Sequence, residues 1–579
     1  MNSKKYRDVL YEAREINNLK ELFQSSTELF AHKTAYLIKE RPGGKYVPVK
    51  YSKVKEDVEC FGTGLLKLGL QGKKIAVIGE NCYEWIITYI ATVNGVGVIV
   101  PLDKDLPVNE IVNLLRRSHV SAVVYSKKCE KLVMEAVAQI ADTENIEYTI
   151  CMKPERDKRS RSIAEIIEMG RTALIEEDRS YLDAEIDSDA MCTLMFTSGT
   201  TGLAKGVMLS HRNIAANVYN MSKYVKIDKD GVGLSVLPMH HSYEMTCHIF
   251  TGFYQGITIA ICEGLKYISK NMIEAKATVM LGVPLVFENM HKKVMKQAAS
   301  KGKLEKMQKM MEVSKKYKLY NEPKLIKKIF KDVHAATGGR IALFIVGGAA
   351  INPKVVEDFQ ALGFPMIQGY GMSENAPIIA VNRDKYSKPA SVGPAMPGTE
   401  IRIINQNDDG IGEIIVRGPS VMLGYYENPE ATEEAIRDGW LYTGDYGYFD
   451  EDGFLYIAGR KKNVIVTKNG KNIFPEEIEY MLTEADYIAE ALVHGEIDGK
   501  SGDTVVKAEI YPDYEQIKKD LGKLKEEEIE GLIKRVVNEV CDTMPAYKRV
   551  TRIGIRTVEF EKTTTRKVKR HAEANKSKK

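Results

Sequence analysis

The feature that most constrains the fold is a repeated alternation of short apolar runs with longer stretches of helical periodicity. Between the runs, apolar side chains recur at helical spacing, as they do from Val108 to Ser118. The strand-like runs lie at 74–78, 97–100, 122–125, 236–237, 258–261, 278–281 and 342–346. This rhythm is typical of parallel strands joined by crossover helices, so we predict an α/β fold with a large N-terminal domain of helix-covered parallel sheets.

From about residue 390 the pattern changes to short strands and Asp-Gly turns. Runs at 401–404 and 413–416, with turns at 408–410 and 452–453, predict a small β-barrel-like unit over about 390–460. A strand, a turn and a helix follow from Val464 to Tyr480. We therefore expect an N-terminal domain over 1–460 and a small, mobile α+β domain over 461–579.

Length, charge and cysteine use restrict the class of protein. A chain of 579 residues is too long for one core, and its net charge of +4 gives no reason to expect nucleic-acid binding. The eight cysteines are scattered without a C-x-x-C pair, which argues against zinc and disulfide frameworks and favours a reducing cytoplasm. The N-terminus lacks the apolar core of a secretory signal.

The loop after the apolar run 191–196 has the composition of a polyphosphate site. Hydroxyls, glycine amides and one ammonium group suit an anion, although Gly206 after the lysine excludes a Walker loop. The alternative is a Gly/Thr-rich turn between strands. The residues concerned are Thr197, Ser198, Gly199, Thr200, Thr201, Gly202 and Lys205.

A second motif follows the apolar segment 364–367. A tyrosine face can stack on a purine, flanking glycines admit the base, and Glu374 is a hard oxygen ligand suited to Mg²⁺. The alternative is a glycine-rich turn with a surface glutamate. The motif consists of Gln368, Gly369, Tyr370, Gly371, Met372, Ser373 and Glu374.

Three further candidates are weaker when each is taken alone. Asp445, in Tyr-Thr-Gly-Asp, and Arg460 could bind ribose hydroxyls, or they could be an ordinary turn residue and a surface cation. His240 and His241 follow Pro238, where packed histidines are the usual alternative. Lys567 lies in a basic segment that would otherwise be interpreted as a solvated tail.

Taken in order, these motifs resemble those of the adenylate-forming superfamily, and most closely the AMP-forming acyl-CoA synthetases of the long- and medium-chain fatty-acid branch. The resemblance covers about residues 190–570. The resemblance implies that Gly348 and Ala349 line the adenine pocket and that Asp445 and Arg460 bind the ribose. It also implies that Thr197 and Glu374 are ligands of Mg²⁺. Arg566 stands where the superfamily usually has glycine.

The resemblance also implies roles in catalysis. Lys205 would contact the phosphates, His241 would place the acyl carboxylate, and Lys567 would bridge that carboxylate and the α-phosphate. Lys462 would be a hinge about which the C-terminal domain rotates. Gly470 would line the tunnel for coenzyme A.

The implied activity is a ligase reaction in two steps. A fatty acid and ATP give acyl-AMP and pyrophosphate, and coenzyme A then displaces AMP. One alternative is a carboxylate-adenylating enzyme with a different acceptor, such as a peptide-synthetase-like adenylation domain or an acyl-carrier-protein ligase, which use a protein thiol. Another is a nucleotide-binding regulator without chemistry. The intact Lys205, Glu374 and Lys567 argue against the regulator.

The expected partners are therefore a fatty acid, ATP and coenzyme A, in the cytoplasm. Lysine-rich segments at 291–331 and 566–579 are either solvated surfaces or sites of weak peripheral attraction to an anionic membrane or to CoA phosphates. Acyl chain length and oligomeric state do not follow from the sequence, which is compatible with a homodimer.

Overall fold

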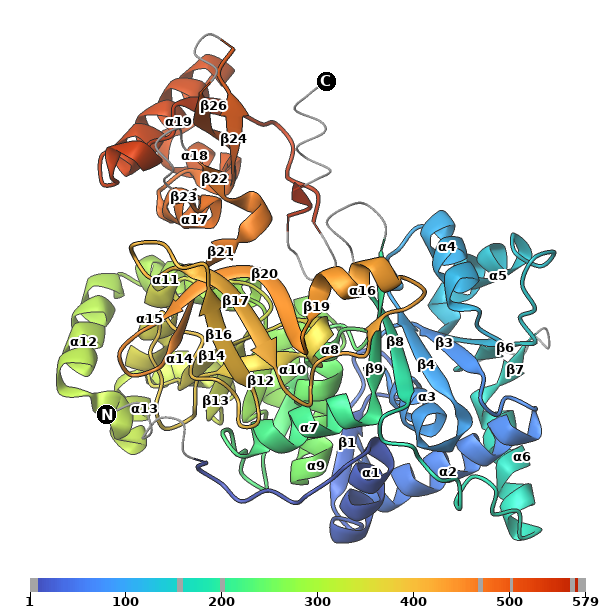
Figure 1. Ribbon diagram of the computed structural model, residues 1–579. Helices are drawn as coiled ribbons and strands as arrows, with labels where there is room; N and C mark the ends of the chain where they lie inside the picture. The colour runs from blue at the N-terminus through green and yellow to red at the C-terminus, as the bar shows by residue number, and fades with distance from the viewer. Residues whose placement is uncertain are drawn as a thin grey trace. The chain divides into compact units, whose positions relative to one another are not determined.

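The computed structural model describes residues 9–153, 160–197, 204–466, 472–499, 503–562 and 568–570. The chain forms two compact units (Figure 1). The first comprises Met1–Glu400, Val416–Leu441 and Glu451–Phe454, and the second comprises Ile401–Ile415, Tyr442–Asp450 and Leu455–Lys579. The domain boundary expected at 460 and the β-rich subdomain at 390–460 remain predictions.

One eight-stranded sheet of the first unit is parallel from β14 to β1, with antiparallel strands β15 and β2 at its two edges. Its strands, in spatial order, are β15 (Ile378–Val381), β14 (Met366–Gly371), β13 (Leu343–Val346), β12 (Val279–Gly282), β10 (Val232–Ser235), β11 (Thr258–Ile261), β1 (Thr34–Ile38) and β2 (Val47–Lys50).

The other eight-stranded sheet is parallel from β8 to β7 and ends in two antiparallel strands, β9 and β18. Its strands, in spatial order, are β18 (Gly424–Tyr425), β9 (Lys205–Ser210), β8 (Met191–Thr197), β4 (Val98–Leu102), β3 (Lys74–Ile78), β5 (Ala122–Tyr125), β6 (Tyr148–Cys151) and β7 (Arg161–Ser162).

Successive side chains of a strand point to opposite faces of the sheet. Because both sets are apolar in these strands, helices pack against both faces. On β3, Ile75 and Val77 join the core that contains helices α2, α3, α7 and α9 and strands of both sheets, whereas Ala76 and Ile78 pack with α4 and α5. The helices are α1 (Leu19–Leu29), α2 (Tyr51–Lys67), α3 (Tyr83–Ala91), α4 (Val108–Ser118), α5 (Glu130–Ala138), α6 (Ile163–Ile175), α7 (His211–Ser222), α8 (Ser242–Glu244), α9 (Thr251–Gln255) and α10 (Ile268–Glu274).

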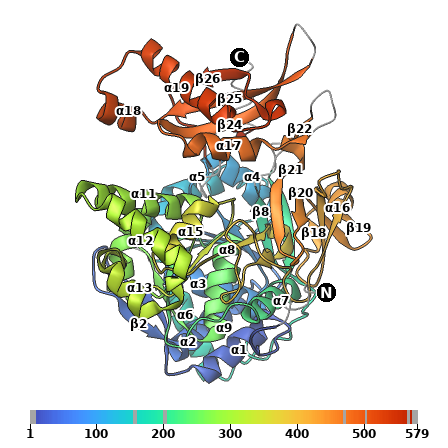
Figure 2. The same ribbon diagram turned by 90° about the vertical axis from the view of Figure 1, so that its left-hand side faces the viewer.

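An outer group of helices follows β12 in the chain. Figure 2 shows α11, α12, α13 and α15 side by side. The buried carboxylate of Asp358 on α15 ties α11 and α12 to α15, because it contacts His291 Nε2 and Lys315 Nζ, each at 3.0 Å. The helices are α11 (Pro284–Ser300), α12 (Leu304–Tyr317), α13 (Pro323–Ile329), α14 (Lys331–Ala336) and α15 (Pro353–Ala361).

The second unit contains most of a five-stranded sheet and a separate three-stranded sheet with its own apolar core. In the three-stranded sheet β24 pairs antiparallel with β25, which pairs parallel with β26. From residue 400 onwards, apart from β18, the strands and α-helices are β16 (Glu400–Ile404), β17 (Gly412–Arg417), α16 (Pro429–Ala435), β19 (Ile436–Arg437), β20 (Trp440–Phe449), β21 (Leu455–Arg460), β22 (Ile465–Val466), β23 (Asn472–Ile473), α17 (Pro475–Glu484), β24 (Ile488–Ile497), β25 (Thr504–Pro512), α18 (Tyr514–Leu521), α19 (Glu526–Cys541) and β26 (Arg552–Ile555). Of these, α16 and β19 belong to the first unit.

The structure confirms the α/β class and most of the predicted strands, but one strand prediction is wrong. The run 236–237 is not a strand, because β10 ends one residue earlier, at Ser235. Val236 and Leu237 are buried beyond the strand end, in a turn held by the Asn81 amide, which donates to Leu237 O at 2.6 Å. Burial without strand geometry produced the misleading pattern.

Candidate functional site

The predicted phosphate loop joins two antiparallel strands of the first unit. Thr197 ends β8 and lies opposite Lys205, the first residue of β9. The Thr197 hydroxyl donates to the Lys205 carbonyl oxygen at 3.4 Å. Ser198, Gly199, Thr200, Thr201 and Gly202 lie outside the described residues. The hairpin therefore fixes both ends of the predicted loop and places a hydroxyl beside the lysine.

Tyr425 connects this hairpin to Glu374. It lies on β18 opposite Val207 of β9, and its hydroxyl donates to Glu374 Oε1 at 2.9 Å. The ammonium group of Lys205 lies 4.8 Å from the centroid of the Tyr425 ring, which is a cation–π distance. Lys205 and Glu374 thus share one aromatic neighbour, although 169 residues separate them in the chain.

The predicted adenine motif runs from the end of β14 into a short 3₁₀ turn over Ser373–Asn375. Gln368 is buried, and Gly369, Tyr370, Gly371, Met372, Ser373 and Glu374 are all half-buried. Gly371 is required by close packing, because a Cβ there would lie 2.1 Å from the Pro377 carbonyl oxygen. The motif therefore presents a partly accessible edge rather than a buried one.

Gly348 and Ala349 follow β13, the strand beside β14, and both are exposed. Gly348 has φ +85°, a left-handed conformation that favours glycine. Because the carboxyl ends of parallel strands meet at the same sheet edge, the two segments that were assigned to adenine lie at neighbouring strand ends.

The two histidines occupy a turn that Asn81 holds in place. The Asn81 amide donates to Leu237 O at 2.6 Å and accepts from Met239 N at 3.1 Å. The rings of His240 and His241 lie 4.3 Å apart. Burial, with a smaller contribution from the charge of Lys104, lowers the pKa of His240 to about 3, so this imidazole is neutral at physiological pH.

Residues just after His241 connect the histidine turn to the adenine motif. The hydroxyl oxygens of Ser242 and Ser373 lie 3.5 Å apart. Glu244 and His248 form a fully buried contact of 2.9 Å between Oε1 and Nδ1. Within the part of the chain that the structure describes, Glu244 Oε2 and His248 Nε2 have no hydrogen-bond partner. Gly233 on β10 makes room for this pair, because a Cβ there would lie 2.3 Å from His248 Nε2.

An apolar cavity of about 20 Å³ lies beside these segments. A water molecule fits such a space but an acyl chain does not, so a chain can enter only if the lining side chains move. Gly369 of the adenine motif forms part of its wall. The lining residues are Met221, Val225, Ile227, Tyr243, Cys247, Thr251, Gln255, Leu281, Ile345, Val346, Gly369, Ile378 and Val381.

The hydroxyl and amide side chains of the lining are already occupied by protein groups. The Tyr243 hydroxyl donates to Ile345 O at 3.2 Å, and the Thr251 hydroxyl donates to Thr246 O at 2.9 Å. The Gln255 amide accepts from Ile227 N at 2.9 Å and donates to Val225 O at 3.0 Å. A ligand in this cavity therefore meets methyl, methylene and aromatic surface, which suits a hydrocarbon.

Asp445 and Arg460 belong to the second unit and are direct partners. They lie opposite each other on β20 and β21, and Arg460 Nε is 2.8 Å from Asp445 Oδ1. The Asp445 residue is 4% exposed, and the Arg460 side chain is 43% exposed. The structure therefore pairs the two residues that were assigned to the ribose.

Lys462, the predicted hinge, lies in a 3₁₀ turn over Lys461–Asn463 of the second unit. The residue is exposed, yet partial burial of its ammonium group, together with the charges of Arg460 and Arg570, lowers its pKa to about 8. Gly470, the predicted tunnel residue, lies outside the described residues.

Lys567 also lies outside the described residues, but both flanks of its segment are described. Lys562 and Val568 form a bridge, and Lys569 N donates to Glu561 O at 2.8 Å. Lys562 pairs with Glu490 on β24, and Arg570 pairs with Glu479 on α17. The described flanking residues, Lys562 and Arg570, are thus held by ion pairs of the second unit.

Among the described residues, the structure brings Thr197, Lys205 and Glu374 together in the first unit and Asp445 with Arg460 in the second. Sequence analysis missed Tyr425 and Asn81, which hold the first group and the histidine turn. Tyr425 lies on a strand of two residues, too short for a periodic pattern. Asn81 gives no signal apart from its position after the strand that ends at Ile78.

The chain matches a known protein family and is similar to curated proteins. The family model described as AMP-binding enzyme matches residues 23–426. Fatty acyl-CoA synthetase B of Dictyostelium discoideum is 27% identical over 537 residues, covering 88% of this chain and 77% of the relative. The chloroplastic long-chain-fatty-acid–[acyl-carrier-protein] ligase AEE15 of Arabidopsis thaliana is 26% identical over 570 residues, covering 86% and 77%.

The fold has solved counterparts. The crystal structure of the anthranilate CoA ligase AuaEII in complex with anthranoyl-AMP superposes with a TM-score of 0.76 at 20% identity and covers 100% of this chain and 99% of that one. At this identity the likeness shows the fold alone, which the chain shares with that CoA ligase.

Proposed function

The chain belongs to the family of AMP-binding enzymes, and on this premise we propose that it is a fatty acid–CoA ligase. The fatty-acid carboxylate attacks the α-phosphorus of ATP and releases pyrophosphate, and the thiol of coenzyme A then displaces AMP from the acyl-AMP. The observation that carries the fatty-acid assignment is the apolar lining of the cavity beside Gly369 of the adenine motif, where the Tyr243, Thr251 and Gln255 side chains are bonded to protein groups and which must widen to admit a chain.

The first step is mainly an electrostatic problem, because a carboxylate must approach a triphosphate. Lys205 supplies a fixed positive charge on the phosphates, and the half-buried adenine motif holds the base. Tyr425 keeps Lys205 and Glu374 in one place through its ring and its hydroxyl.

Glu374 and Thr197 fit a hard divalent cation. Tyr425 occupies Glu374 Oε1, and no group of the described residues is hydrogen-bonded to Oε2, which leaves a carboxylate oxygen for Mg²⁺. The Thr197 hydroxyl is a further oxygen ligand at the adjoining strand end. When bound, Mg²⁺ would neutralise phosphate charge.

Further residues complete the proposed machinery. Asp445 and Arg460 bind the ribose hydroxyls, and His241 places the acyl carboxylate. Lys567 bridges the reacting carboxylate and the α-phosphate. The described residues on either side of it, Lys562 and Arg570, form ion pairs with Glu490 and Glu479 of the second unit.

The second step requires Lys567 to leave room for coenzyme A. We assign Lys462 as the hinge of this movement and Gly470 to the wall of the tunnel that admits the thiol. The position of Lys462 in a short 3₁₀ turn directly after β21 supports the assignment, because such turns absorb backbone rotation.

An acyl-carrier protein is the second candidate acceptor, and the likeness to AEE15 favours it. Coenzyme A remains the preferred acceptor because, besides Fatty acyl-CoA synthetase B, the long-chain-fatty-acid–CoA ligase of Bacillus subtilis is similar to this chain, at 29% identity over 474 residues. Supplying acyl-AMP with either thiol and measuring thioester formation separates the two.

The proposed place of action is the cytoplasm, with weak contact at a membrane surface. In the described ranges, no helix combines the length and the apolar character needed to cross a bilayer.

The roles of Lys567 and Lys462 are tested by measuring the two steps separately. Lys567→Ala should reduce acyl-AMP formation by about 10²–10³-fold while thioester formation from supplied acyl-AMP persists. Lys462→Pro should show the opposite asymmetry, with the larger loss in the second step. Equal losses in both steps would reject the role assigned to that residue.

A further inference from the structure

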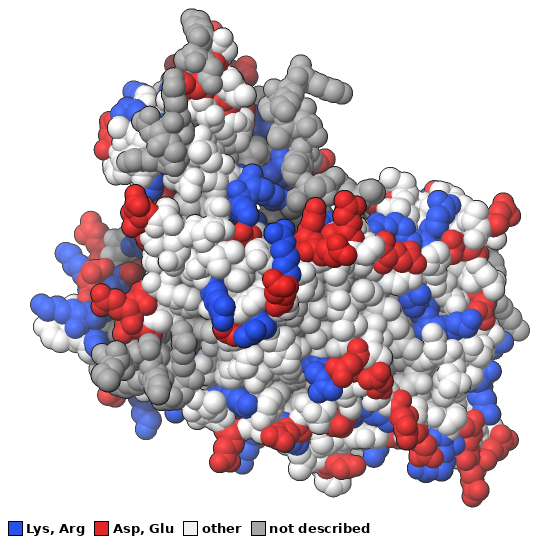
Figure 3. All heavy atoms as spheres, in the orientation of Figure 1, with Lys and Arg blue, Asp and Glu red and all other residues white. Residues whose placement is uncertain are grey.

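The outer helices α11–α14 carry a concentration of positive charge that the proposed reaction does not use. Residues 284–336 contain fourteen lysines, no arginine and five acidic residues, a net charge of +9. The whole chain has a net charge of +4, so the rest of the chain is net negative. Figure 3 shows blue Lys or Arg side chains, interspersed with red Asp and Glu side chains, at the left-hand edge, where α12 lies in Figure 1.

The inward face of these helices is occupied by packing and by one ion-pair anchor. On α12, Met307, Met311 and Ser314 are buried, and Lys315 reaches the buried carboxylate of Asp358. On α11, His291 reaches the same carboxylate. Of the fourteen lysines, only Lys303 and Lys315 lie within 4 Å of a carboxylate of the described residues. The anchor therefore fixes the helices and leaves most lysines to solvent.

The outward face of α12 combines cations with exposed apolar side chains. Lys306, Lys309, Val313, Lys316 and Tyr317 follow helical spacing opposite the buried stripe, and all five are exposed. Tyr317 is 64% exposed and Val313 is 39% exposed. Neighbouring helices repeat this mixture: α11 exposes Leu285, Lys292, Lys293 and Lys296, and α13 exposes Lys324, Leu325 and Lys328.

We propose that the outward face of α11–α13 is a docking surface for anionic lipid headgroups at a bilayer. Lysine without arginine favours diffuse charge attraction over the paired geometry with which arginine recognises a single phosphate or carboxylate. Interleaved apolar and tyrosine side chains suit the boundary between headgroups and acyl chains. Each lysine near an anionic surface contributes independently, so a spread of lysines gives reversible attachment.

Co-sedimentation of the full chain with phospholipid vesicles, without substrate, tests the proposal independently of the ligase activity. Binding to phosphatidylcholine vesicles that contain phosphatidylglycerol should exceed binding to pure phosphatidylcholine vesicles. It should weaken as salt rises from about 0.1 M to about 1 M, because the screening length falls from ~10 Å to ~3 Å. Equal binding to both vesicles, or none, would overturn the proposal.

Matched variants locate the surface. The triple change Lys306→Gln, Lys309→Gln and Lys316→Gln should weaken partitioning onto the anionic vesicles by at least about tenfold. The control triple Lys518→Gln, Lys519→Gln and Lys523→Gln removes the same charge from exposed positions of the second unit and should change partitioning by less than about threefold. Equal effects of the two triples would contradict the assignment to this face.

Two further measurements distinguish lipid binding from unfolding and from binding of a protein partner. Tyr317→Ser should remove part of the vesicle binding that survives high salt, because its ring contributes apolar contact. The α12 triple should keep the thermal stability and the activity on a soluble acid without vesicles. Binding of the wild type to an acidic carrier protein but not to anionic vesicles would replace the lipid surface by a protein partner.

Discussion

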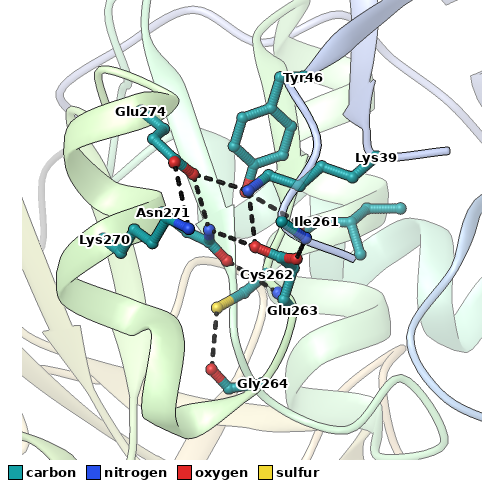
Figure 4. A network of polar contacts seen from close by, with 10 residues as sticks. Lys39, Tyr46, Ile261, Cys262, Glu263, Gly264, Lys270, Asn271 and Glu274 are labelled. Carbon is teal, nitrogen blue, oxygen red and sulfur yellow. Dashed lines mark hydrogen bonds and ion pairs between the residues drawn. The ribbon is translucent and has the colours of Figure 1, made fainter. Parts of the chain in front are cut away.

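Two regions of the first unit hold titratable side chains in contact with other polar groups, and they differ in how completely these groups are paired. In the network of Figure 4, Lys39 Nζ lies 2.6 Å from Glu263 Oε2 and 2.7 Å from Glu274 Oε2, and the Tyr46 ring lies 4.8 Å away. Asn271 donates to both carboxylates and accepts from Glu263 N. The Gly43 N–H, Lys39 and Asn271 lower the pKa of Glu263 to about 2.

The candidate site leaves comparable groups incompletely paired. Within the described part of the chain, Glu244 Oε2, His248 Nε2 and His240 Nε2 have no hydrogen-bond partner although all three atoms are buried. A buried polar atom without a partner costs about 1–3 kcal/mol, so the two regions differ in how completely their polar groups are satisfied. We expect from this contrast that the Lys39 network stabilises the fold, whereas Glu374, the proposed Mg²⁺ ligand, contributes more to the reaction than to stability.

The greatest loss is expected in the reaction itself. Glu374→Gln removes the carboxylate that is proposed to hold Mg²⁺, so acyl-AMP formation should fall by about 10²–10³-fold while the melting temperature stays nearly constant. Glu185→Gln, at an exposed position, serves as control. If Glu374→Gln unfolded the protein instead, the Glu374 carboxylate would stabilise the fold, as the Lys39 network is expected to do.

A change in the Lys39 network should reverse this pattern. Lys39→Met removes the cation of Glu263 and leaves Glu274 with Lys270, 3.8 Å away, as its cation. It should cost about 2–3 kcal/mol of unfolding free energy, with little change in kcat at temperatures where the variant is folded. Lys104→Met, which removes a partly exposed pair with Asp105, should cost less than about 1 kcal/mol. Denaturant unfolding compares the two variants.

The strands and the order of the motifs could be predicted from the sequence because both depend on local composition. The Lys39 network could not, since Lys39 and Glu263 are 224 residues apart and neither belongs to a recognisable motif. Tyr425 was missed for the same reason, because its role arises only when β18 pairs with β9. The placement of His240 beside His241 followed from sequence, but its burial and lowered pKa required the fold.

A more modest effect concerns acid stability. The pKa of His240 is about 3 in the folded state, below its ordinary value of about 6.5, so the unfolded state binds more protons between these pH values. Stability should therefore fall as pH falls from about 6.5 toward 3, by up to about 2 kcal/mol at pH 5. His240→Asn should flatten this dependence. The exposed His119→Asn should leave it unchanged, and an unaltered slope in His240→Asn would show that this imidazole is not the cause.

The smallest change in rate is expected for Tyr425, the neighbour of Lys205 and Glu374 that was not predicted from the sequence. Tyr425→Phe keeps the ring beside Lys205 but removes the hydrogen bond to Glu374, so acyl-AMP formation should slow by about three- to tenfold. Tyr426→Phe, one residue along the chain, should have no comparable effect. Equal rates for both variants would show that the hydroxyl of Tyr425 does not position Glu374.

Pyrophosphate exchange into ATP, measured without coenzyme A across acids from acetate to oleate, tests the ligase assignment without intermediary steps. We expect exchange that depends on a fatty acid and on Mg²⁺ and that is nearly abolished by Glu374→Gln. Absence of exchange with every fatty acid in the wild-type protein would refute the assignment.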